Sequence, residues 1–547
     1  MSASGRGIGG RWAVPALLAG ALVVLTLVVN GAPATAVTGP STTVAAPAST
    51  VDPSGWTVYH HDPAGTGAVT DVGSVATGAR AWTSPALDGQ LYGEPLVAGG
   101  RVYVATENDT VYALSSTTGT VVWSTHVATP VPASRLPCGN IEPTVGITGT
   151  PVIDTTRGEL FVVADELVRG EPAHVLVGLE TATGATELTQ DVDPPGADPA
   201  ALLQRTGLNL TAGTVVFGFG GNYGDCSTYR GWVVGVDEAG GAPVDFGVDS
   251  GAGQSQGAVW MGGAAPAVDT SGHVWVGVGN GSVTSASRGY DHSDSVLELS
   301  TDLRLIQYFA PSSWASDNAA DLDLSMAPAL LPEGQVVIAG KAGIAYLLDG
   351  AHLGGIGGQQ ASLGSVCSDD VDGGSAEVGS VVYLPCLTGI VAVRVARSPP
   401  GLRLVWSSGT GGGPPIVAAG LVWTVGQDGT LSALDPTTGA VRQRATVGLL
   451  ANHFPTPSVG DGILLVSDIQ RVVAFAAPSS SSSSGAPPTA DSPPPTPVPS
   501  PRSVGSAAGS TLSAAAVTGI VVAGLAVLGG AVGMVGRRRR SRRRPDG

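Results

Sequence analysis

Lysine is almost absent from this chain of 547 residues, in which Lys341 is the single example among many arginines. Such usage indicates GC-rich coding DNA. Lys341 therefore either survives by chance or does something with its compact ammonium that the planar guanidinium of arginine cannot do. A surplus of positive charge is also missing, because the formal net charge is −17, and Arg6, Arg11 and the seven arginines of the tail account for 9 of the 26 basic residues. This acidity argues against a nucleic-acid partner and suits divalent cations or neutral and cationic ligands.

Cysteine is scarce too, with four residues, and none lies in the C-x-x-C-H sequence that attaches a c-type haem, so we expect no haem. An even number of cysteines in an exported chain predicts two disulfides, and their order suggests Cys138 with Cys226 and Cys367 with Cys386. The two histidines of "YHHD" (residues 59–62) suggest a metal ligand pair, but adjacent residues need not share a face.

The N-terminus carries an export signal. Residues 1–36 combine two arginines, an apolar run and the small-residue site Ala34-Thr35-Ala36, which predicts a signal peptide cleaved after Ala36. A short linker at 37–55 would follow it.

The C-terminus carries an anchor. Residues 514–535 are apolar over the ~20 residues that span a bilayer, and the arginines of the 536–547 tail place that tail in the cytoplasm. Residues 478–510 are rich in Ser and Pro and predict a disordered, solvated stalk. We therefore expect a single-pass protein of a bacterial cell membrane, with the rest of the chain on the extracytoplasmic side.

One unit repeats through residues 56–477, with alternating Val, Tyr and Ile between Gly and Asp-Gly turns, as strands and hairpins require. The clearest copy is "GEPLVAGGRVYVATENDTVYALSSTTGTVVW" at 93–123. Eight such units begin along the chain, the last lacks its final strand, and an unpaired strand at 78–87 precedes the first. If that strand completes the last sheet, a ring closes and protects its edges. We predict an all-β fold, an eight-bladed β-propeller of four-stranded antiparallel blades; a longer array of separate β domains is the alternative.

The turns "ALSSTTGTVVW" (113–123), "GLETATGATEL" (178–188) and "ALDPTTGAVRQ" (433–443) resemble the A-x-D-x-x-T-G-x-x-x-W repeat of quinoprotein propellers. Of these copies only the first keeps the docking tryptophan, Trp123. The chain is similar to the pyrroloquinoline-quinone (PQQ) dehydrogenases and their cofactor-free, PQQ-like relatives, and resembles an actinobacterial, membrane-anchored member of the polyvinyl alcohol dehydrogenase-like kind. The resemblance covers nearly all of the predicted extracytoplasmic part and supports the fold more than any one function.

The resemblance implies a site at the propeller axis. Trp260, upstream of "GVGN", would form the aromatic floor beneath the flat quinone, and Lys341, in "KAGIAYLLD", would bind the quinone oxygens. Asn280, and Glu166 in "DELVRG", would be calcium ligands. Calcium would polarise the quinone carbonyl that accepts hydride.

The sequence departs from that family at the catalytic base. In "NAADLD", Asn318 stands at the base position, where an amide cannot accept the alcohol proton, and Asp321 would serve instead. Each site residue also has a structural interpretation: Trp260 as an ordinary blade tryptophan, Asn280 as the start of an Asn-Gly turn, Glu166 as a solvated turn residue, and Asp321 and Asp323 as loop caps.

Two classes of function follow. The first is a ligand- or protein-binding scaffold at the cell surface, whose partner is an unknown surface protein or small molecule. The second is a PQQ- and calcium-dependent dehydrogenase that oxidises an alcohol outside the cell. The amide at the base position, the missing haem and the long stalk favour the first, whereas the implied axial residues favour the second.

Overall fold

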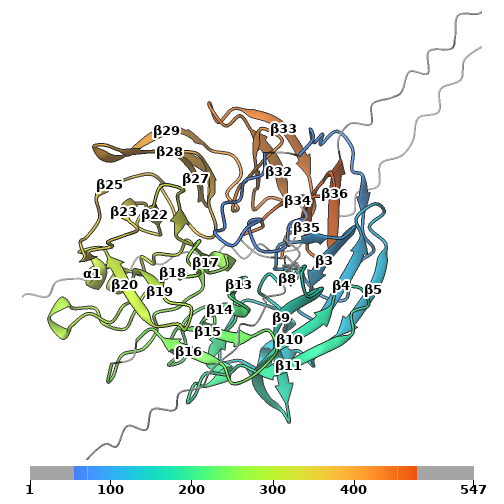
Figure 1. The fold of residues 1–547 in the computed structure, drawn as a ribbon, viewed down its shortest axis with the longest axis horizontal. Coiled ribbons are helices and arrows are strands. Elements are labelled where there is room, and N and C mark those ends of the chain that lie inside the picture. Colours follow the sequence, from blue (N-terminus) through green and yellow to red (C-terminus); the bar gives the residue numbers. More distant parts are fainter. Residues whose placement is uncertain (1–54, 71, 250, 452–453, 477–547) are drawn as a thin grey trace, which may run out of the picture. The chain divides into compact units, whose positions relative to one another are not determined.

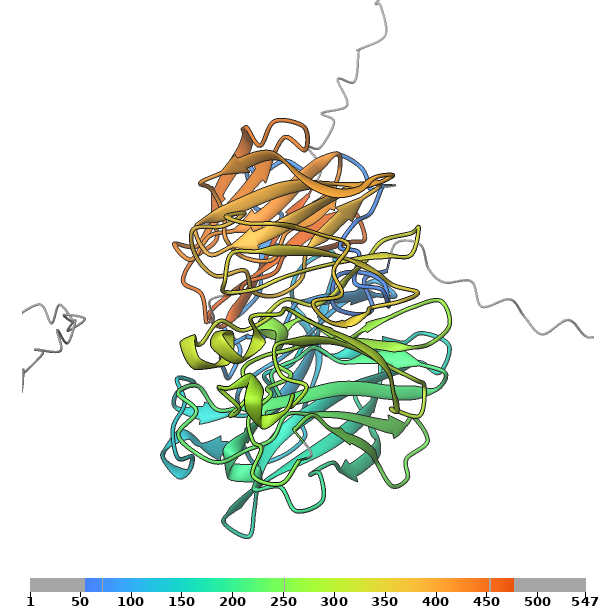
Figure 2. The same ribbon diagram turned by 90° about the vertical axis from the view of Figure 1, so that its left-hand side faces the viewer.

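The computed structural model describes residues 55–476 apart from residues 71, 250 and 452–453. The predicted signal peptide, the stalk, the membrane helix, the tail and most of the linker lie outside the described residues. Within the described part, no helix combines the length and the apolar character needed to cross a bilayer. Its α-helix, α1 (Trp314–Ala320), has seven residues and is the yellow-green coil near the viewer in Figure 2.

Eight antiparallel sheets form a ring, which Figure 1 shows along its axis. Blades 1 to 4 contain β2 (Leu96–Ala98), β3 (Arg101–Ala105), β4 (Thr110–Ser115) and β5 (Val121–His126); β8 (Val152–Asp154), β9 (Glu159–Val168), β10 (Glu171–Glu180) and β11 (Thr186–Asp191); β13 (Asn209–Thr211), β14 (Thr214–Gly221), β15 (Trp232–Asp237) and β16 (Val244–Gly247); and β17 (Ala267–Val268), β18 (Val274–Val278), β19 (Ser295–Leu299) and β20 (Leu305–Ala310). The predicted eight-bladed propeller is confirmed.

Blades 5 to 8 follow the same order, except that the last blade takes its outer strand from the start of the chain. They contain β21 (Ala329–Leu330), β22 (Gln335–Ala339), β23 (Ala345–Asp349) and β25 (Ala361–Leu363); β26 (Ala376–Val378), β27 (Val381–Cys386), β28 (Gly389–Arg397) and β29 (Pro400–Ser408); β30 (Ile416–Ala418), β31 (Leu421–Val425), β32 (Thr430–Leu434) and β33 (Val441–Thr446); and β34 (Ser458–Gly460), β35 (Ile463–Asp468), β36 (Arg471–Ala476) and β1 (Trp82–Thr83).

Several short strands and turns lie outside the four main strands of each blade. Two extra strands join existing sheets: β12 (Leu202–Leu203) pairs with β14, and β24 (Gly355–Ile356) runs parallel to β20. The remaining short elements are the hairpin of β6 (Val131–Pro132) and β7 (Thr144–Val145), and the 3₁₀ turns η1 (Ala133–Arg135), η2 (Pro199–Ala201), η3 (Met261–Gly263) and η4 (Ala286–Arg288).

The sequence pattern of each strand follows its place in the blade. The second strand of a blade is covered on both faces by neighbouring blades, so β18 is a continuous apolar run with every residue buried. The outermost strands β5 and β33 alternate, because one side of the strand meets solvent. The core therefore lies between the blades, where sheet packs on sheet.

The ring closes as predicted. Trp82 of β1 pairs with Ala474 of β36, and Ala81 N donates to Ala474 O at 2.8 Å. The first strand of the propeller thus completes the last blade, which then has four main strands like the others.

The segment before β1 crosses the centre of the ring and binds the innermost strands of several blades (Figure 1, dark blue). Its backbone exchanges hydrogen bonds with Val97 of blade 1, Ile153 of blade 2, Val268 of blade 4, Glu377 of blade 6 and Val417 of blade 7. The segment is thereby a second closure, which spans the axis and links blades from opposite parts of the ring.

In three places a tryptophan of one blade is hydrogen-bonded to the next blade. The indole N–H of Trp82, Trp123 and Trp406 donates to a carbonyl in the T-G turn of the following blade, at 2.8 to 3.0 Å. The turn glycine is required there: Gly184 has φ +75°, and a Cβ on it would lie 2.6 Å from the Trp123 ring. The degenerate motifs led us to expect docking at Trp123, and the structure adds Trp82 and Trp406.

Replacing Trp123 tests this docking. We expect Trp123→Ala to lower the free energy of unfolding by about 3–5 kcal/mol, because a buried indole and its hydrogen bond are lost. The control is Val122→Ala on the same strand, whose side chain is 49% exposed and should change stability by less than about 0.5 kcal/mol. Equal urea midpoints for the two variants would show that the indole does not fasten the blades.

Candidate functional site

Lys341 lies at the centre of the candidate site, just after β22. Its Nζ is 2.6 Å from Asp323 Oδ2, 3.2 Å from Asp321 Oδ1 and 5.7 Å from the centroid of the Trp260 ring. Burial by itself lowers the pKa of Lys341, but Asp323 and then Asp321 outweigh it and raise that pKa above its usual value. The ammonium is therefore charged, and its compact shape lets it meet two carboxylates and an aromatic face together.

Asp323 is the buried partner of this ion pair, with 6% of its surface exposed. Its Oδ1 accepts the backbone N–H of Asn280 at 2.6 Å. Two glycines make the room: a Cβ on Gly279 would lie 2.7 Å from Asp323 Oδ1, and one on Gly340 would lie 2.0 Å from the Asp323 carbonyl oxygen. Burial raises the pKa of Asp323, and Lys341 opposes this rise. Asp323 is thus a member of the site, a role that its sequence pattern did not predict.

Asn280 and Asp321 complete the group around Lys341. Asn280 Nδ2 donates to Asp321 Oδ1 at 2.6 Å, whereas Asn280 Oδ1 is buried and has no hydrogen bond to a described residue. Asp321 ends α1 in the left-handed conformation, with φ 59°, and its side chain is 74% exposed. Asp321 therefore presents a carboxylate to solvent at the edge of this group.

Asn318, at the family's base position, holds a loop. Its Oδ1 accepts Gly281 N at 2.7 Å, and its Nδ2 donates to Val283 O and to Ser293 Oγ, both at 2.8 Å. These bonds fasten the loop after β18 to α1. The amide thus has a structural task, and its proposed catalytic role stays a prediction.

Aromatic and basic side chains extend the site away from Lys341. The ring of Phe454 lies 5.8 Å from that of Trp260, and the buried guanidinium of Arg205 lies 5.9 Å from the rings of both Phe454 and Tyr92. Burial lowers the pKa of Arg205, and Tyr92 and Glu107 oppose this. Sequence reasoning missed Arg205 and Phe454, because neither lies in a recognisable motif.

Glu166 does not join this group. It lies on β9 opposite Ala173 of β10, and burial raises its pKa, with Asp191 and Asp193 adding to the rise. Asp165, which precedes Glu166 in the chain, lies 2.6 Å from Nε2 of the buried His174, and Asp193 lies 2.6 Å from its Nδ1. No hydrogen bond or ion pair links Glu166 to Asn280 among the described residues, so its role as a calcium ligand stays a prediction.

Two other groups of side chains in the described part have the spacing of metal ligands. One contains Cys367 and Cys386, whose sulfurs are joined in a disulfide. The other contains Asp269, His273 and Glu298, which bond to one another, with His273 Nδ1 2.7 Å from Glu298 Oε1. The first group also includes Asp369, but its two sulfurs are taken up by the disulfide, and in the second group His273 Nδ1 is already held by Glu298.

The histidines of "YHHD" also serve separate purposes. His60 is buried, and its Nδ1 lies 2.9 Å from the carbonyl oxygen of Ser375. His61 instead lies with its Nδ1 3.8 Å from Asp62 Oδ2. The pair does not form a shared metal site.

Both predicted disulfides are confirmed. Cys138 and Cys226 join loops that follow blade 1 and interrupt blade 3, across 88 residues. Cys367 and Cys386 clip a shorter loop of 19 residues to β27.

Comparisons with known proteins agree with this architecture. Residues 65–285 match the family model described as outer membrane protein assembly factor BamB. No curated protein matches the chain. The fold resembles quinohemoprotein alcohol dehydrogenases from Pseudomonas putida (TM-score 0.57, 14% identity, 78% of this chain and 80% of that one) and Comamonas testosteroni (TM-score 0.56, 16% identity, 77% and 80%). It also resembles a europium-containing methanol dehydrogenase (TM-score 0.54, 17% identity, 76% and 89%).

At such identities the likeness to solved structures shows the fold alone. The repeat, the ring of eight four-stranded blades and the docking turns define the class of quinoprotein-like propellers. The family match over residues 65–285, together with this fold, supports a PQQ-like propeller. A closer likeness to polyvinyl alcohol dehydrogenase stays a prediction.

Removing the ammonium tests the ion pair. In Lys341→Met, Asp323 loses its counter-charge and its folded-state pKa rises further above the unfolded value of about 3.9. Stability should then fall as pH rises through the range between those two values. We expect a loss of about 3 kcal/mol at pH 8 and a smaller loss at pH 5.

The control for this experiment is Asp321→Asn, at the exposed partner, which should cost less than about 1 kcal/mol. Urea unfolding at both pH values measures the differences. A small and pH-independent loss in Lys341→Met would contradict a buried, neutralised charge pair.

Proposed function

We propose that this protein is a ligand- or protein-binding propeller, held on the extracytoplasmic side of the membrane by its C-terminal helix, and that the Lys341 end of the axis is its binding site. One observation carries this proposal. The ammonium that would bind the quinone oxygens is already engaged by two carboxylates, and the base position holds an amide, Asn318, which makes three structural hydrogen bonds.

The charge around Lys341 suggests the class of ligand. Asp321, Asp323 and Asp370 surround the one ammonium of Lys341, and burial raises the pKa of Asp370 while Lys341 opposes the rise. Negative charge therefore exceeds positive charge around Lys341. A cationic group lying over the half-buried Trp260 and against Asp321 would meet both an aromatic face and a carboxylate. We infer a cationic ligand or a basic segment of a partner protein.

A second candidate, PQQ- and calcium-dependent oxidation of an alcohol, is favoured by a different observation. Side chains from consecutive blades come together at the candidate site, namely Trp260, Asn280, Asp321 and Lys341. The buried Oδ1 of Asn280 makes no hydrogen bond to a described residue, which leaves this oxygen available to a metal ion. The remaining residues do not fit that group, because Glu166 lies with His174 and the carboxylates beside Asn280 already bind Lys341. We derive no step through the quinone.

A titration with PQQ separates the two candidates. The purified protein is titrated in the presence of calcium while tryptophan fluorescence is followed, with Lys341→Ala alongside. We expect no saturable quenching, because Lys341 is unavailable to the quinone oxygens. Saturable quenching at micromolar concentration or below that Lys341→Ala abolishes would overturn our proposal and support the dehydrogenase.

A cationic probe tests the binding site directly. We expect a tetralysine peptide to change the tryptophan fluorescence saturably, more weakly as salt is added. Asp321→Asn should weaken this binding at least about tenfold, which corresponds to the loss of one charge-assisted contact. The matched control is Asp302→Asn, an exposed aspartate paired with Arg304 in a turn of blade 4, which should bind as the parent does. An equal response in all three proteins would contradict the proposed site.

A further inference from the structure

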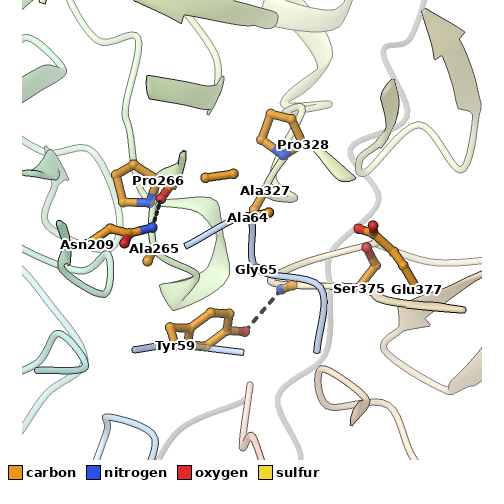
Figure 3. Close-up of a pocket in the computed structure, with 12 residues that line it drawn as sticks. Tyr59, Ala64, Gly65, Asn209, Ala265, Pro266, Ala327, Pro328, Ser375 and Glu377 are labelled. Atoms are coloured by element: carbon orange, nitrogen blue, oxygen red, sulfur yellow. Dashed lines mark hydrogen bonds between the residues drawn. The ribbon is translucent and has the colours of Figure 1, made fainter. Parts of the chain in front are cut away.

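A small polar cavity lies near the axis, between the segment that crosses the ring and the innermost strands (Figure 3). It leaves room for about one water-sized sphere, and therefore for one water molecule or one small ion. Its lining comes from the crossing segment and from blades 3 to 6: Tyr59, Ala64, Gly65, Asn209, Ala265, Pro266, Ala267, Ala327, Pro328, Gly374, Ser375 and Glu377.

The carboxylate of Glu377 lines this cavity beside the hydroxyl of Ser375. Its residue is 6% exposed, and neither carboxylate oxygen makes a hydrogen bond of ordinary geometry to a described residue. The backbone N–H of Glu377 donates to Thr66 O at 2.9 Å, which fixes the side chain at the wall of the cavity. A buried carboxyl group without partners is costly in either protonation state, because a charge needs a counter-charge and a neutral acid needs an acceptor for its proton.

The surroundings add negative charge and no described cation. Burial raises the pKa of Glu377 well above its usual value, Asp62 raises it further, and the nearby Ser375 hydroxyl opposes the rise. Asp62 accepts the N–H of Thr66 at 3.1 Å. Burial lowers the pKa of His60 to about 4, so this neighbour of Ser375 is neutral at pH 7. An ion from solution is then the remaining source of positive charge.

Oxygen donors gather around the same space. Figure 3 shows the side chains of Ser375 and Glu377 together on one wall, across from Asn209 and Pro266. The Pro266 carbonyl accepts Asn209 Nδ2 at 2.8 Å and has a second lone pair. Carboxylate, hydroxyl and carbonyl oxygens are the ligands of hard divalent cations.

We propose that this axial cavity is a site for one divalent cation of the calcium type, with Glu377 as its charged ligand and the Ser375 hydroxyl as a second oxygen ligand. The ion joins the crossing segment to blade 6, where Thr66 and Glu377 already share a backbone hydrogen bond. Its effect is structural: it stabilises the closure of the ring from within. The site is distinct from the group around Lys341 and does not depend on the ligand bound there.

The test uses the purified protein stripped of metal with a chelator and returned to chelator-free buffer. Thermal unfolding is then followed as calcium is added, and bound metal is measured by mass spectrometry before and after stripping. We expect the midpoint to rise saturably, by about 3 °C at a hundredfold excess over the dissociation constant, because calcium binds only the folded state. Glu377→Gln should remove this rise.

Three variants make the result specific. Glu171→Gln changes an exposed glutamate at the start of β10 and should keep the full rise. Asp321→Asn should keep it too, which separates this cavity from calcium held near Asn280. Ser375→Ala keeps the carboxylate and should raise the calcium concentration at half effect about tenfold, so the proposal stays testable if Glu377→Gln does not fold.

Two results would overturn the proposal. The first is an equal calcium-dependent rise in the parent, in Glu377→Gln and in Ser375→Ala. The second is a parent protein with no bound divalent metal and no response to calcium, together with a Glu377→Gln variant as stable as the parent. In that case Glu377 is a neutral acid beside a buried water.

Discussion

The closure of the ring is the constraint on which the rest of the structure depends. A propeller buries the faces of its blades against each other, so a missing outer strand would expose two sheet faces and an edge. Here β1 supplies that strand by pairing with β36, and the segment before it spans the axis and bonds to five inner strands. The Lys341 group is built from loops that only a closed ring holds in place, and the axial cavity has the crossing segment as one wall.

Buried carboxylates are the second organising feature, and they follow from the acidic composition. Lys341 compensates Asp323 and Asp321, and His174 compensates Asp165 and Asp193. The carboxylates of Asp109 and Asp294 are buried too, but no basic side chain bonds to them among the described residues. Burial raises the pKa of Asp109 and of Asp294 to about 9, so each is neutral at pH 7 unless a cation joins it. The protein thus resolves its internal negative charge by scarce basic residues, by protonation, or by ions from solution.

A fold of this kind supports both oxidation chemistry and protein assembly, so function rests on the site. The residue types that the resemblance implied are present and four of them meet. Their contacts, however, are with one another: the ammonium binds carboxylates, and the amide at the base position fastens a loop. In our proposal, a site in which carboxylates outnumber the ammonium recognises a cationic ligand at its exposed carboxylate and is poorly suited to a polyanionic cofactor.

The sequence by itself determined the number of blades, the closing strand and both disulfide pairs, because strand alternation, turn chemistry and the order of the cysteines are local or countable properties. It also selected Trp260, Asn280, Asp321 and Lys341, because motif spacing preserves their places in consecutive blades. Only the tertiary structure decided that Asp323 pairs with Lys341, that Glu166 lies in another group, and that Phe454 adjoins both Trp260 and Arg205. The reason is physical: loops from distant blades converge at the axis, and which charges meet there depends on burial and distance, which no local pattern encodes.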